Sequence, residues 1–121
     1  MSAKRFFGQW PDNVLEAIER YDAHLQQVLP GIQVMPDESG GVIGYAYGSG
    51  YKQTICTLIP SKKGLKLGFY KGTELPDPKG LLGGTGKVHR FVELDLQAKP
   101  SAALNALLKA ALKAYHERMK A

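Results

Sequence analysis

Two segments, one near each end of the chain, repeat apolar residues at the three- and four-residue steps of an amphipathic helix. The first carries Val14, Ile18, Tyr21, Leu25 and Val28. Asp12 or Asn13 is suited to cap its start, and Pro30-Gly31 ends it. The second segment follows Pro100-Ser101 and carries Leu104, Leu108, Ala111, Tyr115 and Met119, with Leu107 and Leu112 widening the apolar face. The pattern therefore predicts a helix at each end.

Between these helices the apolar period changes to two, which is the period of a β-strand. The predicted strands are a short one around 32–35, one that carries Ile43, Tyr45 and Tyr47 on one face, the β-branched segment 51–59, the alternating segment 65–70, and a last strand over 88–96. Turn residues over 48–50 and 60–64 separate successive strands. Such short connections predict an antiparallel meander of four or five strands.

This order of elements predicts an α+β fold, with residues 1–121 forming a single domain. Two amphipathic helices with one apolar stripe each are expected to cover the same face of the antiparallel sheet, which makes a two-layer sandwich. The other face is then covered only by the long loop before the last strand. An uncovered sheet face that carries aromatic side chains is a natural place for a ligand or partner.

Composition narrows the classes of function. Sixteen basic and eleven acidic residues give a net charge of +5, which favours anionic partners. The basic residues are spread along the chain rather than gathered beside aromatic residues, which disfavours nucleic acid as the ligand. The single cysteine excludes an internal disulfide, and no apolar run reaches the ~20 residues needed to cross a membrane. A cytoplasmic location without membrane attachment is expected.

The residue types that carry catalysis do not form a recognisable arrangement along the chain. His24, His89 and His116 fall on different predicted elements and have no companion cysteine. Cys56 lies in the middle of a strand among apolar residues, which is typical of a core position. We therefore expect a binding domain without catalytic activity or a bound cofactor, and its partner to be a small anionic ligand or a protein.

The loop over residues 71–87 is the predicted site, because it is longer than the usual connection of about 4–6 residues. Successive backbone N–H groups in such a loop can form an anion-binding nest beside a lysine. The residues expected to do so are Gly83, Gly84, Thr85, Gly86 and Lys87. The same glycines can equally serve only to make tight turns.

Arg90 lies in phase with the apolar residues of the last predicted strand, so its guanidinium group needs a partner. It is expected either to pair with Asp77 or Glu74 and so hold the loop, or to bind an anionic group together with the nearby lysine. The apolar walls of the groove between the open sheet face and the loop are expected to come from Tyr45, Tyr47 and Phe69.

A second hypothesis rests on acidic residues of the first helix. They are Asp12, Glu16, Glu19 and Asp22, which are expected to form a ridge opposite the apolar stripe. Carboxylate oxygens suit hard cations, so this ridge could bind iron or magnesium weakly. The alternative is that the acids only complement the helix dipole and that Glu16 pairs with Arg20.

One pattern in the second half of the chain resembles the YdhG-like family of bacterial domains. It reads Leu67-x-Phe69-x-x-Gly72-x-x-Leu75-x-Asp77-Pro78-x-Gly80-Leu81-Leu82-x-Gly84-x-Gly86-Lys87-x-x-Arg90. The resemblance covers about residues 47–94 and implies a small α+β sandwich with the layout of frataxins. Some members of that family are described as frataxin-like intracellular iron chaperones. The resemblance therefore implies iron delivery as an alternative function, with the acidic ridge as the metal site.

Overall fold

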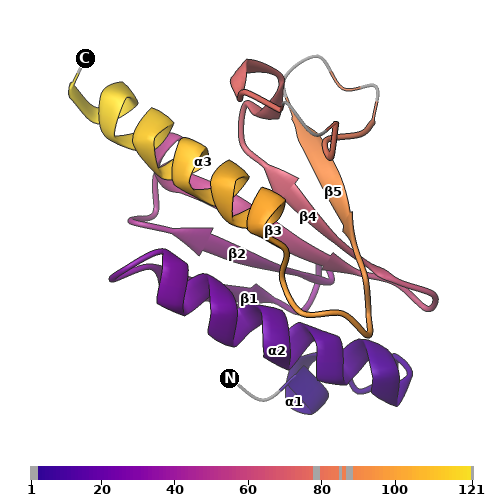
Figure 1. The fold of residues 1–121 in the computed structure, drawn as a ribbon. Helices are drawn as coiled ribbons and strands as arrows, with labels where there is room; N and C mark the ends of the chain where they lie inside the picture. The colour runs from indigo at the N-terminus through magenta and orange to yellow at the C-terminus, as the bar shows by residue number, and fades with distance from the viewer. Residues whose placement is uncertain (1–2, 78–79, 85, 87–88, 121) are drawn as a thin grey trace.

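The computed structural model describes residues 3–77, 80–84, 86 and 89–120. Three helices, five strands and two short 3-10 helices follow one another along these residues (Figure 1). In chain order they are α1 (Ala3–Phe7), α2 (Asp12–Val28), β1 (Gln33–Asp37), β2 (Val42–Ala46), η1 (Tyr51–Gln53), β3 (Thr54–Pro60), β4 (Leu65–Phe69), η2 (Gly72–Glu74), β5 (Arg90–Leu94) and α3 (Ala102–Lys120).

The five strands form one antiparallel sheet in the order β1-β2-β3-β4-β5. Each strand pairs with the next one in the chain, as the short turns predict, so the meander is confirmed. Ile43, Leu58, Leu67 and Val92 are successive partners and form one apolar row across β2 to β5. Their side chains lie in the core.

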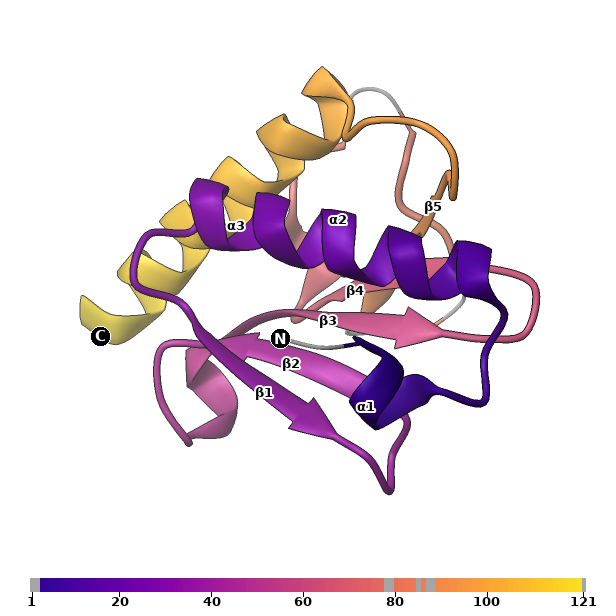
Figure 2. The same ribbon diagram turned by 90° about the horizontal axis from the view of Figure 1, so that it is seen from below.

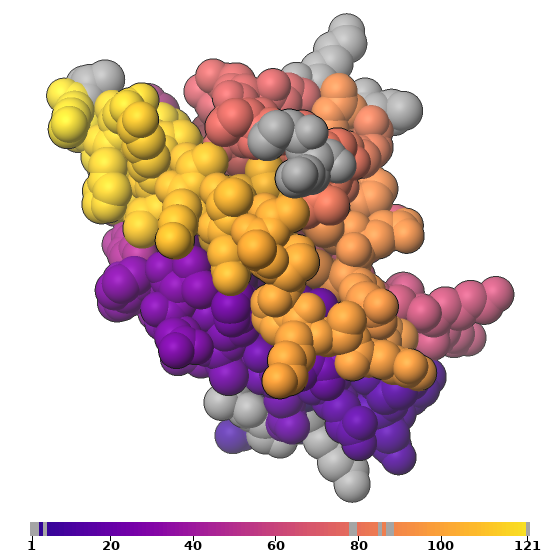
Figure 3. All heavy atoms as spheres, in the orientation of Figure 1, coloured from indigo at the N-terminus to yellow at the C-terminus, as the bar shows by residue number. Residues whose placement is uncertain are grey.

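The helices α2 and α3 lie on the same face of this sheet, which confirms the predicted two-layer arrangement. Figure 2 shows both helices in one layer above the strands. Their buried residues, among them Ile18, Leu25 and Leu108, join the apolar residues of the sheet in one core. A space-filling view from this side shows the helices and the chain around them hiding most of the sheet (Figure 3). Neither α2 nor α3 lies on the opposite side of the sheet, which we call the uncovered face (Figure 2).

The first helix of the chain, α1, is not predicted by the sequence pattern. It is short, and it packs against α2. Ala3 and Phe7 are fully buried there and complete the core at one end of α2. A five-residue helix shows too little of the 3.6-residue period to be recognised, because it spans little more than one turn.

The start of α3 lies where the sequence predicts it, whereas the cap predicted for the start of α2 differs from the one observed. Ser101 caps α3, since its Oγ accepts a hydrogen bond from the N–H of Leu104 at 3.1 Å. The cap expected for α2 at Asp12 or Asn13 is wrong, because the N-cap residue is Pro11 and makes no side-chain cap hydrogen bond. At the other end of α3, Met119 is 48 % exposed and lies outside the core.

The described residues of the long loop after β4 lie at the β5 edge of the sheet and beside α3. Gly83 pairs with Phe91 as an isolated antiparallel bridge, which continues the sheet by one residue pair. Leu81 and Leu82 pack against the core. Leu81 and Pro76 also line a hollow with residues from the start of α3. For these described residues, the expectation that the loop covers the second sheet face is therefore wrong.

In the part of the chain that the structure describes, no helix is both long and apolar enough to span a membrane.

Candidate functional site

A shallow hollow of about 270 Å³ lies on the uncovered face. Its lining comes from β2, β3, β4, η1 and the residue before β5, namely Val42, Tyr51, Thr54, Thr57, Ile59, Gly68, Phe69, Tyr70 and His89. The residues that come from strand interiors, such as Thr57 and Gly68, alternate with core residues such as Leu58 and Leu67. They therefore point away from the helices.

The floor of the hollow is low because glycine occurs in the middle of the sheet. Gly68 of β4 is the partner of Thr57 and lines the hollow. A Cβ added at Gly68 would meet Ile59 Cδ1 at 3.4 Å and the carbonyl oxygen of Thr57 at 3.8 Å. These are ordinary contacts, so packing does not require glycine at this position. What the missing side chain provides is open space above the strand.

Three rings form the wall at the end of the hollow near η1. Tyr51 and Tyr70 meet edge-on, with their centroids 4.9 Å apart and their planes at 88°. The His89 ring lies 5.5 Å from the Tyr70 ring and 6.1 Å from the Tyr51 ring. Edge-on packing of this kind is favourable for aromatic rings and fixes their orientation.

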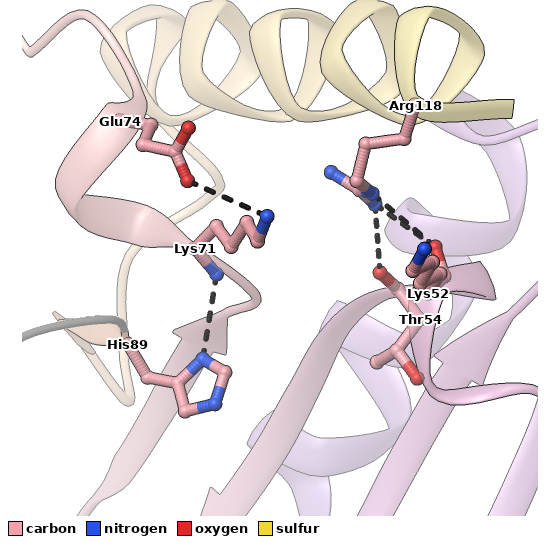
Figure 4. A network of polar contacts seen from close by, with 6 residues as sticks. All are labelled: Lys52, Thr54, Lys71, Glu74, His89 and Arg118. Atoms are coloured by element: carbon pink, nitrogen blue, oxygen red, sulfur yellow. Dashed lines mark hydrogen bonds and ion pairs between the residues drawn. The ribbon is translucent and has the colours of Figure 1, made fainter. Parts of the chain in front are cut away.

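Two hydrogen bonds connect these rings to the backbone. The N–H of Lys71 donates to His89 Nδ1 at 3.3 Å (Figure 4). His89 Nε2 in turn lies 2.6 Å from the hydroxyl oxygen of Tyr51. Lys71 has a left-handed backbone with a φ of 51°, which begins the turn into η2 and directs its N–H toward the imidazole.

Cationic side chains lie against the outer side of this wall. The Arg118 guanidinium lies 4.7 Å from the Tyr70 ring centroid and donates hydrogen bonds to the carbonyl oxygens of Lys52 and Thr54 (Figure 4). Lys71 Nζ lies 5.9 Å from the same ring and forms an ion pair with Glu74 at 3.9 Å. Cations are attracted to the faces of aromatic rings, so Tyr70 holds both groups near the hollow.

Two of the predicted wall residues belong to the core that the helices cover, although Phe69 also contributes to the lining of the hollow. Tyr45 is fully buried under α2 and donates a hydrogen bond to Asp22 at 2.7 Å. Burial, together with this bond to Asp22, raises the pKa of Tyr45 well above its usual value. Phe69 belongs to the same cross-strand row as Tyr45 and Cys56, and its side chain is part of the core. Both residues therefore have a structural position, because they are in phase with the apolar row that the helices cover.

Tyr47 is also away from the hollow. Its ring stacks on Tyr115 of α3 with centroids 5.0 Å apart, and its hydroxyl donates to the carbonyl oxygen of Pro30 at 2.9 Å. These contacts place it where α3 passes the end of β2. It does not line the hollow.

Among the described residues of the predicted anion nest, Gly83 already uses its N–H within the fold. The N–H of Gly83 donates to the Phe91 carbonyl oxygen at 2.7 Å, so the bridge to β5 uses it. Arg90 Nη1 donates to the carbonyl oxygen of Gly84 at 2.5 Å. Gly84 and Gly86 are exposed, and Thr85 and Lys87 lie outside the described residues.

Asp77 supports the loop in a different way from the one expected. Its carboxylate oxygens accept hydrogen bonds from the N–H groups of Leu81 and Leu82, each at 2.8 Å. Neither Asp77 nor Glu74 forms an ion pair with Arg90, although all three residues are described. The loop is thus held by hydrogen bonds between the Asp77 carboxylate and its own backbone, and Arg90 adds a hydrogen bond to the carbonyl oxygen of Gly84.

The acidic ridge of α2 is incomplete, because one of its four members points inward. Asp22 is only 5 % exposed and accepts hydrogen bonds from Tyr45 and Gln26. Glu19 accepts a hydrogen bond from the N–H of Ala3 at 3.2 Å, while Asp12 and Glu16 are exposed. Within the described residues no three His, Cys, Asp or Glu side chains come together as a potential metal site.

The hollow brings together residues that the sequence analysis did not select, above all Tyr51, Thr57, Gly68, Tyr70 and His89. One signal was present: the strand residues among them alternate with the apolar core positions, so they must lie on the opposite face. The contact between Tyr51 and His89 left no comparable signal, because 38 residues separate them.

Comparison with known proteins places the chain in no family, since no family model, curated protein or solved structure matches it.

Proposed function

We propose that this protein is a non-catalytic binding domain that takes up a small anionic ligand with a flat apolar body on the uncovered face of the sheet. The observation that carries the proposal is the hollow itself: a glycine floor beside three fixed rings, with cations behind them. This differs from the groove expected between the sheet and the loop, while the class of ligand remains the same.

The size and lining of the hollow suit a ligand of one or two rings. Small-molecule sites are usually clefts of about 300–1,000 Å³, lined by apolar and aromatic side chains with a few polar groups. The hollow, at about 270 Å³, lies just below that range, which suits a small ligand. The side chains of Val42 and Ile59 and the rings of Tyr51 and Tyr70 supply the apolar contact area, and Thr57 and His89 supply polar atoms.

The charges around the hollow favour an anion. Among the described residues, none that lines it is acidic. The charged groups at its aromatic wall are Lys71 and Arg118, which lie against Tyr70, and Glu74 balances part of the charge of Lys71. The net charge of +5 adds to the attraction of an anion over a longer distance.

Titration of the isotope-labelled protein with 2-naphthoate, followed by NMR, tests this proposal. We expect shifts of the amide signals of Thr57, Gly68 and Tyr70. The Gly68→Ala variant should bind about tenfold more weakly, which corresponds to ~1.4 kcal/mol, because its methyl group fills the floor on which the ring lies.

Gly44→Ala is the matched control. Gly44 lies in the same cross-strand row, and a Cβ there would also meet only ordinary contacts, at 3.7 and 3.8 Å from Met35, but the residue does not line the hollow. It should bind naphthoate like the parent protein. Shifts centred on Tyr47 and Arg90, or equal affinities for both glycine variants, would contradict the proposed site.

A further inference from the structure

We propose that Tyr51 is the residue that selects the ligand, that His89 orients it as a hydrogen-bond donor, and that the ligand is an aromatic carboxylate. This inference rests on the proposed function, because it assigns a ligand class to the same hollow. It comes from the direction in which hydrogen bonds run from the backbone to the Tyr51 hydroxyl.

The first step is the tautomer of His89. A backbone N–H can only donate, so the nitrogen that receives the Lys71 N–H must be without a hydrogen. That nitrogen is Nδ1. A neutral imidazole carries one hydrogen, which is then on Nε2. The backbone N–H of Lys71 thereby determines that Nε2 is the donor nitrogen of the His89 side chain.

The second step is the direction of the bond to Tyr51. Because His89 Nε2 carries the hydrogen, it donates to the hydroxyl oxygen of Tyr51, which lies 2.6 Å away. Tyr51 thus accepts from His89 and keeps its own hydrogen for another partner. The side chain is 67 % exposed and lines the hollow, so that partner can be a ligand. The edge-on contact with Tyr70 holds the ring in place.

The third step is the nature of the acceptor. A hydroxyl that donates to an ionised acceptor makes a stronger bond than one that donates to a neutral acceptor. A phosphate usually needs several N–H donors, such as those of a nest or a helix start. Of the N–H groups expected in the nest, that of Gly83 is already bonded to Phe91, and the hollow lined by Tyr51 includes none of the described loop glycines. The hollow instead offers one directed hydroxyl, that of Tyr51, with the cations of Lys71 and Arg118 further away, and this arrangement suits a carboxylate. The apolar lining suits an aromatic ring attached to that carboxylate.

Two measurements test the inference, and the first needs no ligand. Long-range proton–nitrogen correlation NMR of the imidazole ring distinguishes the two neutral tautomers of His89. We expect the form with hydrogen on Nε2. A signal from the form with hydrogen on Nδ1 would overturn the inference, because Tyr51 would then have to donate to His89.

The second measurement compares 2-naphthoate with 2-naphthylmethylammonium, which has the same ring system and a group that can only donate. Naphthoate should bind and the ammonium should not. The Tyr51→Phe variant, which keeps the ring and loses the hydroxyl, should bind naphthoate about ten- to a hundredfold more weakly. Tyr47→Phe removes a hydroxyl away from the hollow and should have no effect.

A double-mutant cycle shows whether His89 acts through Tyr51. His89→Phe alone should weaken naphthoate binding, and adding it to Tyr51→Phe should cause little further loss. A purely structural role of His89 would instead give additive losses.

The outcomes separate this inference from the proposed function. If naphthoate alone binds in the hollow and Tyr51→Phe has no effect, the proposed function stands and the role of Tyr51 is wrong. If neither compound shifts the signals of the hollow residues, both proposals fail.

Discussion

Tyr45 and Tyr51 have the same phenol side chain but lie in opposite environments. Tyr45 is fully buried and donates to Asp22, which is itself 5 % exposed and also bonded to Gln26. Tyr51 is exposed, and its hydroxyl is held beside His89 at the hollow. A buried hydroxyl whose hydrogen is already used can only stabilise the fold, whereas the exposed one has a hydrogen-bonding site left for recognition.

Replacing Tyr45 with Phe should reduce the free energy of unfolding by about 1–3 kcal/mol near pH 8, because it leaves the buried carboxylate of Asp22 without one of its donors. Urea denaturation measures this loss. Tyr47→Phe is the control, since it removes a hydroxyl with an exposed carbonyl partner, and it should cost less than about 1 kcal/mol. Equal losses would contradict the assigned role of Tyr45.

The same variant should also change how stability depends on alkaline pH. The pKa of Tyr45 is raised in the folded protein by burial and by Asp22, whereas an unfolded tyrosine titrates near pH 10. Above that pH the unfolded chain loses the proton and the folded protein keeps it, so stability falls as pH rises. This group contributes at most ~1.4 kcal/mol per pH unit. Between pH 9 and 11, Tyr45→Phe should therefore lose less stability than the parent protein.

Cys56 lies close to Tyr45 in the same cross-strand row and behaves as the sequence predicts. It is a free, fully buried cysteine, and burial raises the pKa of its thiol. A buried thiol that keeps its proton is a poor nucleophile, so Cys56 is a core residue.

At the scale of the elements, the two long helices begin in different ways. The N-terminus of α3 has a side-chain cap from Ser101, whereas α2 follows Pro11, whose carbonyl oxygen accepts hydrogen bonds from the N–H groups of Val14 and Leu15. Proline has no side-chain acceptor, so the first N–H groups of α2 gain no cap from it. The helix α1 instead packs against α2 further along, where the N–H of Ala3 donates to Glu19.

Replacing Ser101 with Ala should therefore destabilise the protein by about 1 kcal/mol, because it removes the acceptor of the Leu104 N–H. Asp12→Ala is the comparison at the start of α2. Asp12 is exposed in the first helical turn and acts only through the helix dipole, so its loss should cost about 0.3–0.5 kcal/mol. Thermal and urea unfolding of both variants measure the difference, and a larger loss for Asp12→Ala would contradict this description of the caps.

At the scale of the whole molecule, Arg118 connects the end of α3 to the wall of the hollow. Its guanidinium donates to the carbonyl oxygens of Lys52 in η1 and of Thr54 at the start of β3 (Figure 4). The same group lies against the ring of Tyr70. The last turn of the chain's final helix thus holds two residues at the edge of the site, although the helix itself lies on the other face of the sheet.

The Arg118→Ala variant should lose about 1–2 kcal/mol of stability, because two backbone carbonyl groups lose a charged donor. It should also bind 2-naphthoate several-fold more weakly, since Tyr70 and η1 lose their support. Lys120→Ala removes a charge of the same sign from an exposed position near the end of the same helix and should change neither quantity by much. Matching losses of affinity in both variants would indicate a general effect of charge instead.

The fold could largely be predicted from the sequence, while the site could not. The periods of the apolar residues identified both long helices and the order of the strands, and the single apolar stripe on each helix required them to share one sheet face. The same apolar periods already indicated that Tyr45 and Phe69 face the core, because these residues are in phase with Ile43 and Leu67. The predicted groove placed both residues on the uncovered face, whereas Tyr45 is fully buried in the core and Phe69 is a core residue that also contributes to the lining of the hollow.

The sequence alone therefore predicts the features that depend on neighbouring residues in the chain. These are the helices and strands, their order, and the strand residues that point away from the core. The bridge of the long loop to β5 and the hydrogen bonds that join Lys71, His89 and Tyr51 became visible only in the folded structure. The physical reason is that periodicity records burial, which is repeated at every turn or pleat. A single hydrogen bond between distant residues leaves no such repeat.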